Sequence, residues 1–365
     1  MESLACLVSV IIPAYNSEKY IERCIGGVLN CQETELEVIV VDDGSTDNTY
    51  SVVKLLAEKD SRVKVYTQQN QGVSKTRNVG LSYAQGKYVI FSDSDDMLEG
   101  KNLKQLIDFA EDCNADLVAF GRVNCYENGS RTEYFPKGNI LNVADDFQFA
   151  FSQTILNQPN FGWSSCNKLF KREIINNNNI RFLDYRAINS EDRLFNLCYF
   201  MNISKVAFFE KCHFYNFVRD DSLSHAKGFP ESVKRNIKAF EYVCDYTICL
   251  PEDVRYKLLR YYFVSFLNNV VVLELDVNDA GVKSSAISFR DAIIGMNEVL
   301  EAKGIICKFN YEKSIYYADN GFKYRMLNNL ILKHNFYPLA ATILFGYVKF
   351  TDMMNTFKSK QKGKK

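Results

Sequence analysis

The first 120 residues alternate between short apolar runs and amphipathic segments, and this alternation is the strongest constraint on the fold. The runs are rich in Val and Ile and predict five strands: Leu7–Ile12, Leu36–Val41, Val63–Tyr66, Tyr88–Phe91 and Asp116–Phe120. Between them, apolar residues recur at helical spacing, as in Ile21, Cys24, Ile25 and Val28. Continuous apolar strands are typical of a parallel sheet with helices on both faces. The sequence therefore predicts an α/β fold with a Rossmann-like, mostly parallel central sheet.

Polar side chains follow three of these strands at the point where each strand ends. After the first strand, Tyr15 can stack on a nucleobase and Asn16 can cap the next helix. After the second comes Asp42-Asp43-Gly44-Ser45-Thr46, in which an Asp can accept a hydrogen bond from a base N–H. Taken singly, each segment is also ordinary turn chemistry. Ligands of parallel α/β sheets bind beyond the carboxyl ends of the strands, so together these ends indicate one shared ligand, which a nucleotide fits.

The third polar segment follows Tyr88–Phe91 and carries three carboxylates in Ser92-Asp93-Ser94-Asp95-Asp96. Residues two apart on an extended chain point to the same side, so Asp93 and Asp95 can converge on one object. Two close carboxylates repel each other unless a cation or a shared proton relieves them. Oxygen ligands are those that Mg²⁺ and Mn²⁺ prefer. The pattern predicts a Mn²⁺ or Mg²⁺ cofactor that bridges the protein to phosphates.

Four segments in this order resemble glycosyltransferase family 2 of the GT-A fold: Val8 through Asn16, Val40 through Asp47, Gly72 through Asn78, and Phe91 through Asp96. The resemblance covers roughly residues 5–225. It implies an inverting enzyme that moves a sugar from a nucleotide diphosphate, usually UDP, with a divalent metal. The implied acceptor is a hydroxyl of a glycan or of a lipid-linked saccharide, as in bacterial surface-polysaccharide biosynthesis.

The resemblance also implies site residues, position by position. Those expected to contact the nucleotide are Pro13, Tyr15, Asn16, Asp43, Arg77, Asp93 and Arg219. Among them, Arg77 matches a basic residue near the base and Asp93 the acid near the ribose. Asp95 matches the acid that binds the metal, with Asp93 and His225 expected beside it. The nearby Asp96 is expected to have a structural role.

A second acidic segment, Glu191-Asp192-Arg193-Leu194-Phe195, resembles the part of the family that carries its general base. An inverting displacement needs a carboxylate to take the proton of the acceptor hydroxyl, and we expect Asp192 in that role. Glu191 would orient it or bind the acceptor, although an acid pair at a helix start also compensates the helix dipole. Trp163 lies in a segment that resembles the acceptor border, where it would face a sugar ring or pack in the core.

Beyond residue 122 the pattern is less regular, and after Pro230 it is persistently helical. We expect a catalytic domain over residues 1–230 and a helical region over 231–357. Smaller elements are expected as a hairpin at Glu127–Ser130, helices at Lys168–Asn176 and Asp192–Met201, and two strands at Lys205–Phe209 and His213–Val218.

The carboxyl-terminal part combines an apolar segment with a basic tail. Leu339–Phe357 is apolar and aromatic, and residues 358–365 contain five Lys. Such a pair is typical of a helix that lies on an anionic membrane surface. A packing helix with a solvated tail is the alternative.

The composition is that of an ordinary globular protein, with 47% hydrophobic and 24% charged residues and a formal net charge of zero. A neutral chain has no global field that would attract nucleic acid. Eleven scattered Cys and three His favour a reduced, cytoplasmic protein without a zinc site. We find no signal peptide and no bilayer-length apolar stretch, so we expect at most peripheral contact with the inner face of the membrane. A catalytically inactive sugar-nucleotide-binding or scaffold protein and a nucleotidyltransferase are the alternatives, and the oligomeric state is left open.

Overall fold

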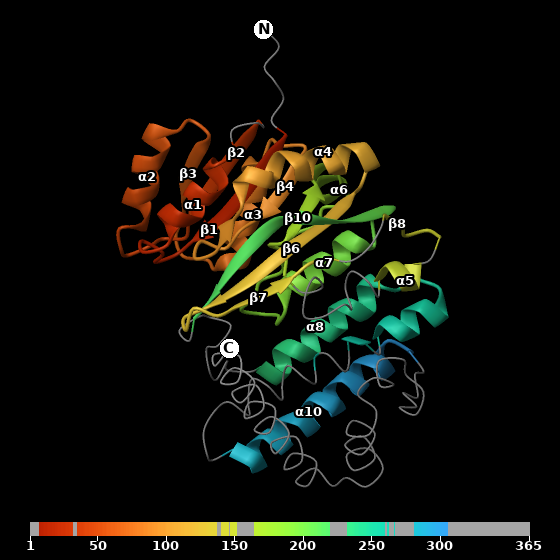
Figure 1. Cartoon of the computed structure of the whole chain (residues 1–365). Coiled ribbons are helices and arrows are strands. Elements are labelled where there is room, and N and C mark those ends of the chain that lie inside the picture. The colour runs from red at the N-terminus through yellow and green to blue at the C-terminus, as the bar shows by residue number, and fades with distance from the viewer. Residues whose placement is uncertain are drawn as a thin grey trace, which may run out of the picture. The chain divides into compact units, whose positions relative to one another are not determined.

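The computed structural model describes residues 7–31, 35–136, 140–145, 147–151, 164–219, 232–259, 261, 262, 266 and 281–305 (Figure 1). The chain divides into two compact units, Met1–Ser222 and Leu223–Lys365. The first unit contains one large sheet with helices against it. In the second unit, the described residues form helices.

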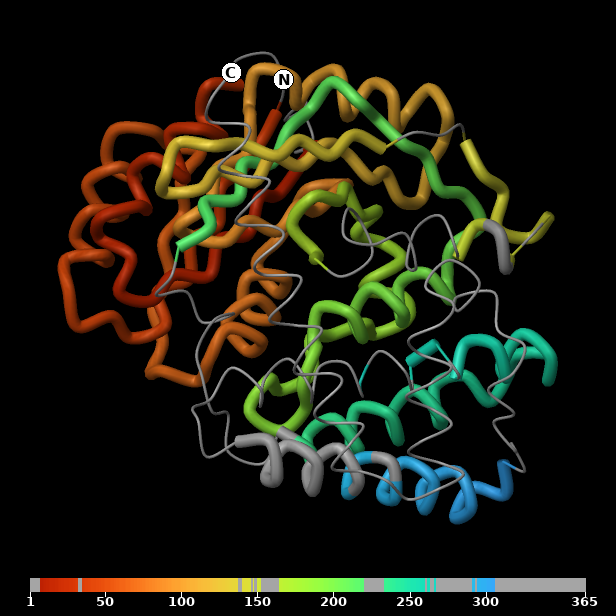
Figure 2. The backbone as a smooth tube through the Cα atoms, turned by 60° about the horizontal axis from the view of Figure 1, so that its bottom comes forward, coloured from red at the N-terminus to blue at the C-terminus, as the bar shows by residue number. Residues whose placement is uncertain are grey.

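The sheet of the first unit has ten strands. Their bounds are β1 Val8–Ala14, β2 Leu36–Asp42, β3 Val63–Thr67, β4 Tyr88–Phe91, β5 Met97–Leu98, β6 Leu117–Tyr126, β7 Arg131–Tyr134, β8 Leu141–Asn142, β9 Lys168–Lys171 and β10 Lys205–Val218. The order is β3-β2-β1-β4-β9-β6-β10-β5, with β7 beside β6 and β8 beside β10. The strands β3, β2, β1 and β4 are parallel, and so are β6 and β10, which run side by side in both backbone views (Figure 2). This confirms the predicted mostly parallel α/β architecture.

Helices cover both faces of this sheet. The helices of the first unit are α1 Ile21–Leu29, α2 Thr49–Lys59, α3 Val73–Tyr83, the 3₁₀ turn η1 Gly100–Asn102, α4 Leu103–Cys113, α5 Phe147–Phe151, α6 Arg172–Asn177 and α7 Glu191–Phe200. Alternate residues of β1, such as Val10 and Ile12, share a fully buried core with α1 and α4. The other face meets α3, where a Cβ on Gly80 would lie 2.4 Å from Cγ2 of Ile11. The missing side chain lets α3 approach the strand closely.

The first strand runs two residues further than we predicted, through Pro13 to Ala14. A proline in a central strand lacks the N–H that a ladder needs. Here the carbonyl of Ile11 accepts the last bond on that side, from the N–H of Ser92, because β4 ends at Phe91. Pro13 lies two residues after Ile11 and faces the same side of β1. Because β4 has already ended there, no carbonyl of a neighbouring strand needs a backbone N–H from Pro13.

The prediction of a helix over Lys168–Asn176 was wrong in its first half. Lys168–Lys171 is the strand β9, and only Arg172–Asn177 is helical. The strand fills the position between β4 and β6 and pairs antiparallel with both. Tertiary pairing of this kind overrides local helical spacing. The two strands predicted at Lys205–Phe209 and His213–Val218 are one strand, β10, with an irregularity between Phe209 and His213.

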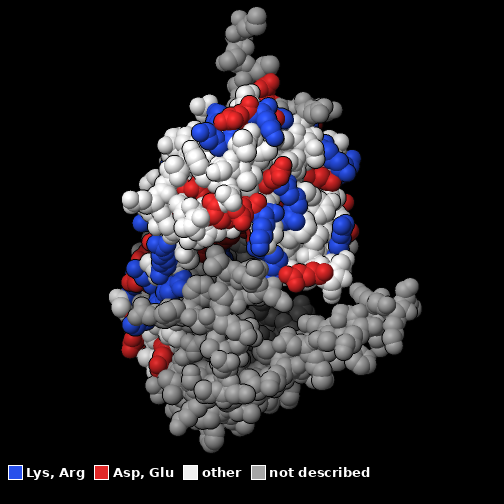
Figure 3. Space-filling model, turned by 90° about the vertical axis from the view of Figure 1, so that its left-hand side faces the viewer, with Lys and Arg blue, Asp and Glu red and all other residues white. Residues whose placement is uncertain are grey.

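Other local predictions are confirmed. β6 and β7 form the hairpin expected at Glu127–Ser130, with Gly129 at φ +79° in its turn. A positive φ suits glycine, because a Cβ would be strained there. The helix predicted at Asp192–Met201 is α7, which begins and ends one residue earlier than predicted. Acidic and basic side chains lie interspersed on the face of the described residues drawn in Figure 3.

In the second unit, α8 (Ser232–Tyr246) packs against α10 (Gly281–Ala302). A Cβ on Gly295 would lie 2.3 Å from Cδ1 of Ile237, so the glycine allows a close crossing. Lys303 adds an ion pair with Asp245, with 2.5 Å between Nζ and Oδ1. No helix among the described residues has the length and apolarity needed to cross a membrane. The predicted membrane segment Leu339–Phe357 and the Lys-rich tail lie outside the described residues.

Candidate active site

The loops that follow β1, β2 and β4 lie at one edge of the sheet and are joined by hydrogen bonds. The hydroxyls of Ser17 and Ser94 are 2.6 Å apart, which links the loops after β1 and β4. The N–H of Asn16 donates to Oγ of Ser45 at 3.0 Å, and its Oδ1 accepts from the N–H of Thr46 at 2.9 Å. The three strand ends therefore form one surface. Tyr15 projects from it with 49% of its surface exposed, which leaves its ring free to stack.

The predicted capping role of Asn16 was wrong. Helix α1 begins at Ile21, and Asn16 adopts a left-handed backbone with φ of 48°. Because Oδ1 of Asn16 is used by Thr46, its side chain joins two loops instead of starting a helix.

Asp43 is buried and organises the loop that leads into α3. Its Oδ1 accepts from Nε2 of Gln68 at 2.7 Å and from the N–H of Gln71 at 2.8 Å. Its Oδ2 accepts from the N–H of Gly72 at 2.7 Å. A carboxylate has about four acceptor positions, so one remains for a ligand on this count. The loop over residues 68–72 and the end of β2 thus form a single wall at this end of the site.

The three acids after β4 have different environments. Asp96 is 2% exposed, and its carboxylate accepts from Nδ2 of Asn216 at 3.0 Å and from the N–H of Phe217 at 2.9 Å. It fastens the loop to β10, which agrees with the structural role predicted for it. Asp93 and Asp95 keep 40% and 28% of their side chains exposed. Burial, and then the charge of Asp93, raise the pKa of Asp95.

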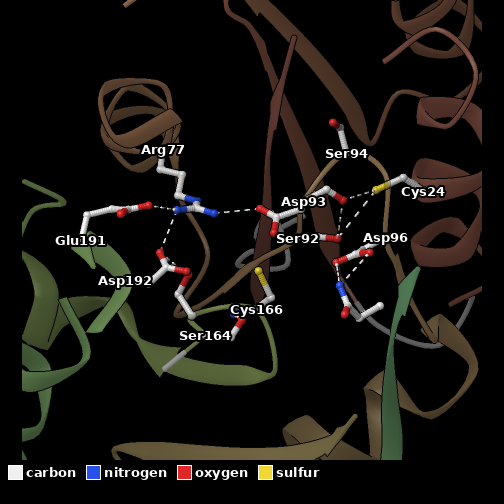
Figure 4. Close-up of polar contacts among 12 residues, drawn as sticks. Cys24, Arg77, Ser92, Asp93, Ser94, Asp96, Ser164, Cys166, Glu191 and Asp192 are labelled. Atoms are coloured by element: carbon white, nitrogen blue, oxygen red, sulfur yellow. Dashed lines mark hydrogen bonds and ion pairs between the residues drawn. The ribbon is translucent and has the colours of Figure 1, made fainter. Parts of the chain in front are cut away.

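Arg77 connects the loop after β4 with the start of α7 (Figure 4). Its Nη2 donates to Oδ1 of Asp93 at 2.8 Å, and its Nη1 donates to Oδ1 of Asp192 at 2.7 Å. Oε1 of Glu191 lies 3.6 Å from the same Nη1. We predicted that Arg77 lies near the nucleobase of the donor. In the structure its side chain is 4% exposed and points toward these three acids.

Aromatic side chains pack against the guanidinium group of Arg77. Its Cζ lies 5.1 Å from the ring centre of Phe182, which stacks on Phe195 of α7 at 4.1 Å. Phe91, the last residue of β4, meets both rings edge to face at 4.9 and 5.5 Å. Edge-to-face pairs contribute about 0.5–1.5 kcal/mol each beyond their buried area. The cluster therefore fixes β4, α7 and Arg77 relative to one another.

The acid pair begins α7, as predicted for a helix start. Ser190 precedes it with φ of 65°, a left-handed backbone that turns the chain sharply into the helix. Burial and the charge of Asp192 raise the pKa of Glu191 to about 7. Burial likewise raises the pKa of Asp192, although Arg77 opposes this shift. Both groups are thus stronger bases than an exposed carboxylate.

Arg219 directly follows β10 and forms an ion pair with Asp95. Its Cζ lies 4.3 Å from the ring centre of Tyr20 in the loop before α1. Arg23 of α1 stacks on Phe217 at 3.6 Å and donates from Nη2 to the carbonyl of Asp95 at 2.5 Å. Two guanidinium groups therefore surround the second acid of the Asp93-Ser94-Asp95 sequence.

The charges of the site suit a divalent cation. Four carboxylates, those of Asp93, Asp95, Glu191 and Asp192, lie beside three guanidinium groups, those of Arg23, Arg77 and Arg219. No group of three or more His, Cys, Asp or Glu within the described part of the chain is arranged to hold a metal ion. Two carboxylates are nevertheless enough for Mg²⁺ or Mn²⁺ when phosphates and water complete the coordination. The donor set of Asp93 and Asp95 therefore fits such an ion.

The structure brings together most of the predicted site residues. Trp163 and His225 lie outside the described residues. Four further residues that the sequence analysis did not assign lie at the site. Arg23 and Ser165 contact Asp95 and Asp192, and Lys168 and Asn196 donate to the carbonyl of Ser164 beside them. Lys168 was read as part of a helix, so its inward direction was missed. Arg23 is on the polar side of an amphipathic helix, and no local pattern distinguishes it from a surface Arg.

A mostly parallel sheet with acids at the ends of β2 and β4 and an acid pair facing them is the arrangement expected of the GT-A class. A family profile described as glycosyl transferase family 2 matches residues 9–177. The cholesterol galactosyltransferase of Borreliella burgdorferi is 30% identical over 305 residues, which are 80% of this chain and 84% of that protein. The chain therefore belongs to glycosyltransferase family 2 and is a glycosyltransferase.

Two staphylococcal proteins extend the comparison. The poly(ribitol-phosphate) β-N-acetylglucosaminyltransferase TarP of Staphylococcus aureus is 32% identical over 225 residues, 60% of this chain and 65% of that protein. The crystal structure of S. aureus TarS residues 1–349 in complex with UDP-GlcNAc superimposes with a TM-score of 0.66 at 22% identity, and it covers 94% of this chain and 92% of TarS 1–349. At that identity the likeness shows the GT-A fold.

Proposed function

We propose that this chain is an inverting, metal-dependent glycosyltransferase that transfers a sugar from a UDP-sugar to a hydroxyl of a glycan or lipid-linked saccharide. The contact that supports this most strongly is the double hydrogen bond of Arg77, at 2.8 Å to Asp93 and 2.7 Å to Asp192. One buried guanidinium thus joins an acid of the donor side to the candidate base.

In this proposal Asp192 is the general base. It removes the proton of the acceptor hydroxyl while that oxygen attacks the anomeric carbon from the face opposite the diphosphate. The bond from the anomeric carbon to the acceptor oxygen forms as the bond to the phosphate oxygen breaks, so the configuration inverts. The raised pKa of Asp192 favours proton uptake, and Arg77 keeps its carboxylate in place.

The remaining residues would hold the donor. Tyr15 offers an exposed ring to the base, with Pro13, Asn16 and Asp43 around it. Arg219, which forms an ion pair with Asp95, would bind a phosphate oxygen of the donor. We place His225 near the same phosphates and Trp163 at the acceptor on the family resemblance, with Glu191 beside Asp192.

Asp95 and Asp93 would hold the Mn²⁺ or Mg²⁺ ion. When bound, the ion would offset the negative charge that develops on the leaving diphosphate. The partial exposure of both carboxylates, 40% for Asp93 and 28% for Asp95, supports this assignment, because an ion can reach them.

The nucleotide and acceptor are supported by relatives. A TarS structure holds UDP-GlcNAc, which supports a UDP-sugar donor. The names of two relatives specify a sterol acceptor and a poly(ribitol-phosphate) acceptor, so the acceptor class varies among proteins of similar identity. We propose a glycan or lipid-linked saccharide acceptor for this chain on the family resemblance.

The test is nucleotide release from a panel of UDP-, GDP- and dTDP-sugars with and without Mn²⁺, for the wild type, Asp95→Ala and Asp192→Asn. We expect metal-dependent release from one donor that is lost in Asp95→Ala. Asp192→Asn should lower turnover by about 10²- to 10⁴-fold while it still binds the donor. Folded wild-type protein that neither binds nor releases any donor would favour a scaffold role instead.

We also propose that the apolar segment Leu339–Phe357 and the tail 358–365 give peripheral contact with the inner face of the cytoplasmic membrane. The support is the five Lys of the tail and the apolar segment before it. Flotation with anionic and with neutral vesicles tests this, with the five Lys changed to Gln as the control variant. Equal flotation of the two proteins on anionic vesicles would count against it.

A further inference from the structure

The segment directly before β9 touches the candidate base. Ser165 is fully buried, and its hydroxyl donates to Oδ1 of Asp192 at 3.2 Å. The same oxygen accepts the hydrogen bond of Arg77. Hydrogen bonds from the side chain and from the backbone of Ser165 both act to lower the pKa of Asp192, against the effect of burial. Ser165 therefore contacts the carboxylate from the side of β9, whereas Arg77 reaches it from α3.

The preceding residue is held by two buried donors. The carbonyl of Ser164 accepts from Nζ of Lys168 at 2.5 Å and from Nδ2 of Asn196 at 3.2 Å. Lys168 is 1% exposed and Asn196 is 2% exposed. Asn196 lies one helical turn after Asp192 on α7, so the Ser164–Ser165 segment is fastened to that helix at two levels.

A buried lysine is costly and needs a compensating partner. Burial lowers the pKa of Lys168 to about 7, and the charge of Asp192 works in the opposite direction. An apolar side chain would fill the same space without this cost. The amine of Lys168 donates to the carbonyl of Ser164, and holding this segment in place is the function that a buried lysine would serve here.

We propose that the Ser164–Ser165 segment, held by Lys168 and Asn196, positions the general base, with Ser165 fixing the orientation of the Asp192 carboxylate for removal of the acceptor proton. Ser165 is a positioning residue, because it acts through Asp192. This inference rests on the proposed function. It adds to that function a reason why β9 is inserted between β4 and β6, directly after this segment.

The test compares Ser165→Ala and Ser165→Thr with the wild type in steady-state transfer and in donor binding by calorimetry. Loss of a hydrogen bond to a charged group predicts that Ser165→Ala lowers kcat by roughly 10- to 100-fold. Donor affinity should stay within about twofold, because Ser165 contacts the general base Asp192 and not Asp93 or Asp95. Ser165→Thr keeps the hydroxyl and should recover most of kcat. Ser165→Cys, which keeps the volume but donates weakly, replaces Ser165→Ala if that variant does not fold.

A second comparison separates positioning from folding. In the Asp192→Asn background, Ser165→Ala should cause little further loss of kcat, because its effect passes through the carboxylate. The same fold loss in both backgrounds, or an unchanged kcat in Ser165→Ala, would overturn the inference.

Ser9→Ala is the matched control. Ser9 is also fully buried and donates to a carboxylate, Oε1 of Glu37 at 2.6 Å, but at the opposite ends of the strands. It should lower stability without changing kcat. If the wild type itself transfers no sugar, the proposed function has failed, whereas an active wild type with a fully active Ser165→Ala contradicts only this inference.

Discussion

Replacing Arg77 with Met should strongly destabilise the first unit. The guanidinium is 4% exposed and makes hydrogen bonds of 2.7 Å and 2.8 Å to two carboxylates. Removing one partner of a buried ion pair costs about 3–5 kcal/mol. Water can rehydrate Asp93, which is 40% exposed, so its share falls toward the roughly 0.5 kcal/mol of a surface pair. Most of the loss therefore comes from Asp192 and Glu191, and we expect about 3 kcal/mol in all.

The assay is urea denaturation followed by circular dichroism. Lys87→Met is the control, because the Lys87–Glu111 pair is 46% and 40% exposed and its loss should change stability by less than about 0.5 kcal/mol.

A double-mutant cycle tests the reasoning directly. Asp192→Asn removes the charge that Arg77 compensates, so the two changes together should cost less than their sum by about 1–2 kcal/mol. Arg77→Lys should recover only part of the loss, since an ammonium group cannot bridge two carboxylates in the same plane. Additive changes, or a loss in Arg77→Met no larger than in Lys87→Met, would refute the argument.

Three further predictions concern charge and packing. The pKa of Glu191 is about 7 in the folded protein against an ordinary 4.5, so the folded state binds a proton more readily than the unfolded state. Without metal, the free energy of unfolding should therefore rise by about 1–3 kcal/mol as the pH falls from 8 to 5, and Glu191→Gln should remove this rise. Arg219→Ala removes the ion pair of Asp95, so Mn²⁺ should bind several-fold more tightly in the absence of donor, as measured by electron paramagnetic resonance. UDP should bind more weakly to the same variant. Unchanged affinities would exclude Arg219 both as a partner of the metal ligand and as a phosphate ligand. Gly86→Ala places a Cβ 2.5 Å from the backbone N of Ser9 and should cost about 1–3 kcal/mol in thermal unfolding. Gly26→Ala, with nothing within 4 Å, should be neutral or stabilising, and equal effects of the two glycine changes would contradict the packing argument.

The parts of the fold that repeat locally could be predicted from the sequence. The runs Leu36–Val41 and Tyr88–Phe91 became β2 and β4 nearly residue for residue, because continuous apolar β-branched segments have few alternatives in a covered sheet. β9 could not be predicted in this way. Its four residues read equally well as a helix, and only pairing with β4 and β6, distant in sequence, decides between them.

The candidate site shows the same division. The acids after β2 and β4 were identified because they follow strands, and parallel strands bring such ends together. The acid pair of α7 was identified from the family resemblance alone. The partners of Arg77 were not identified, since they depend on how α3 and α7 pack and on the ring of Phe182 beneath the guanidinium. Ser165 and Lys168 were missed for the same reason. A serine and a lysine near an aromatic segment carry no local mark of burial.

The place of β9 in the sheet also has a consequence for synthesis. β1 to β4 leave the ribosome first and can pair at once, but the outer edge of β4 waits for Lys168–Lys171, roughly 80 residues later. At bacterial and eukaryotic elongation rates of about 5–20 residues per second, this delay is on the order of ten seconds. During it, the nascent chain presents the apolar edge Tyr88–Phe91 unpaired, and an open edge of this kind pairs readily with other chains. The stretch of translation between these two strands is therefore when this protein most needs protection from aggregation.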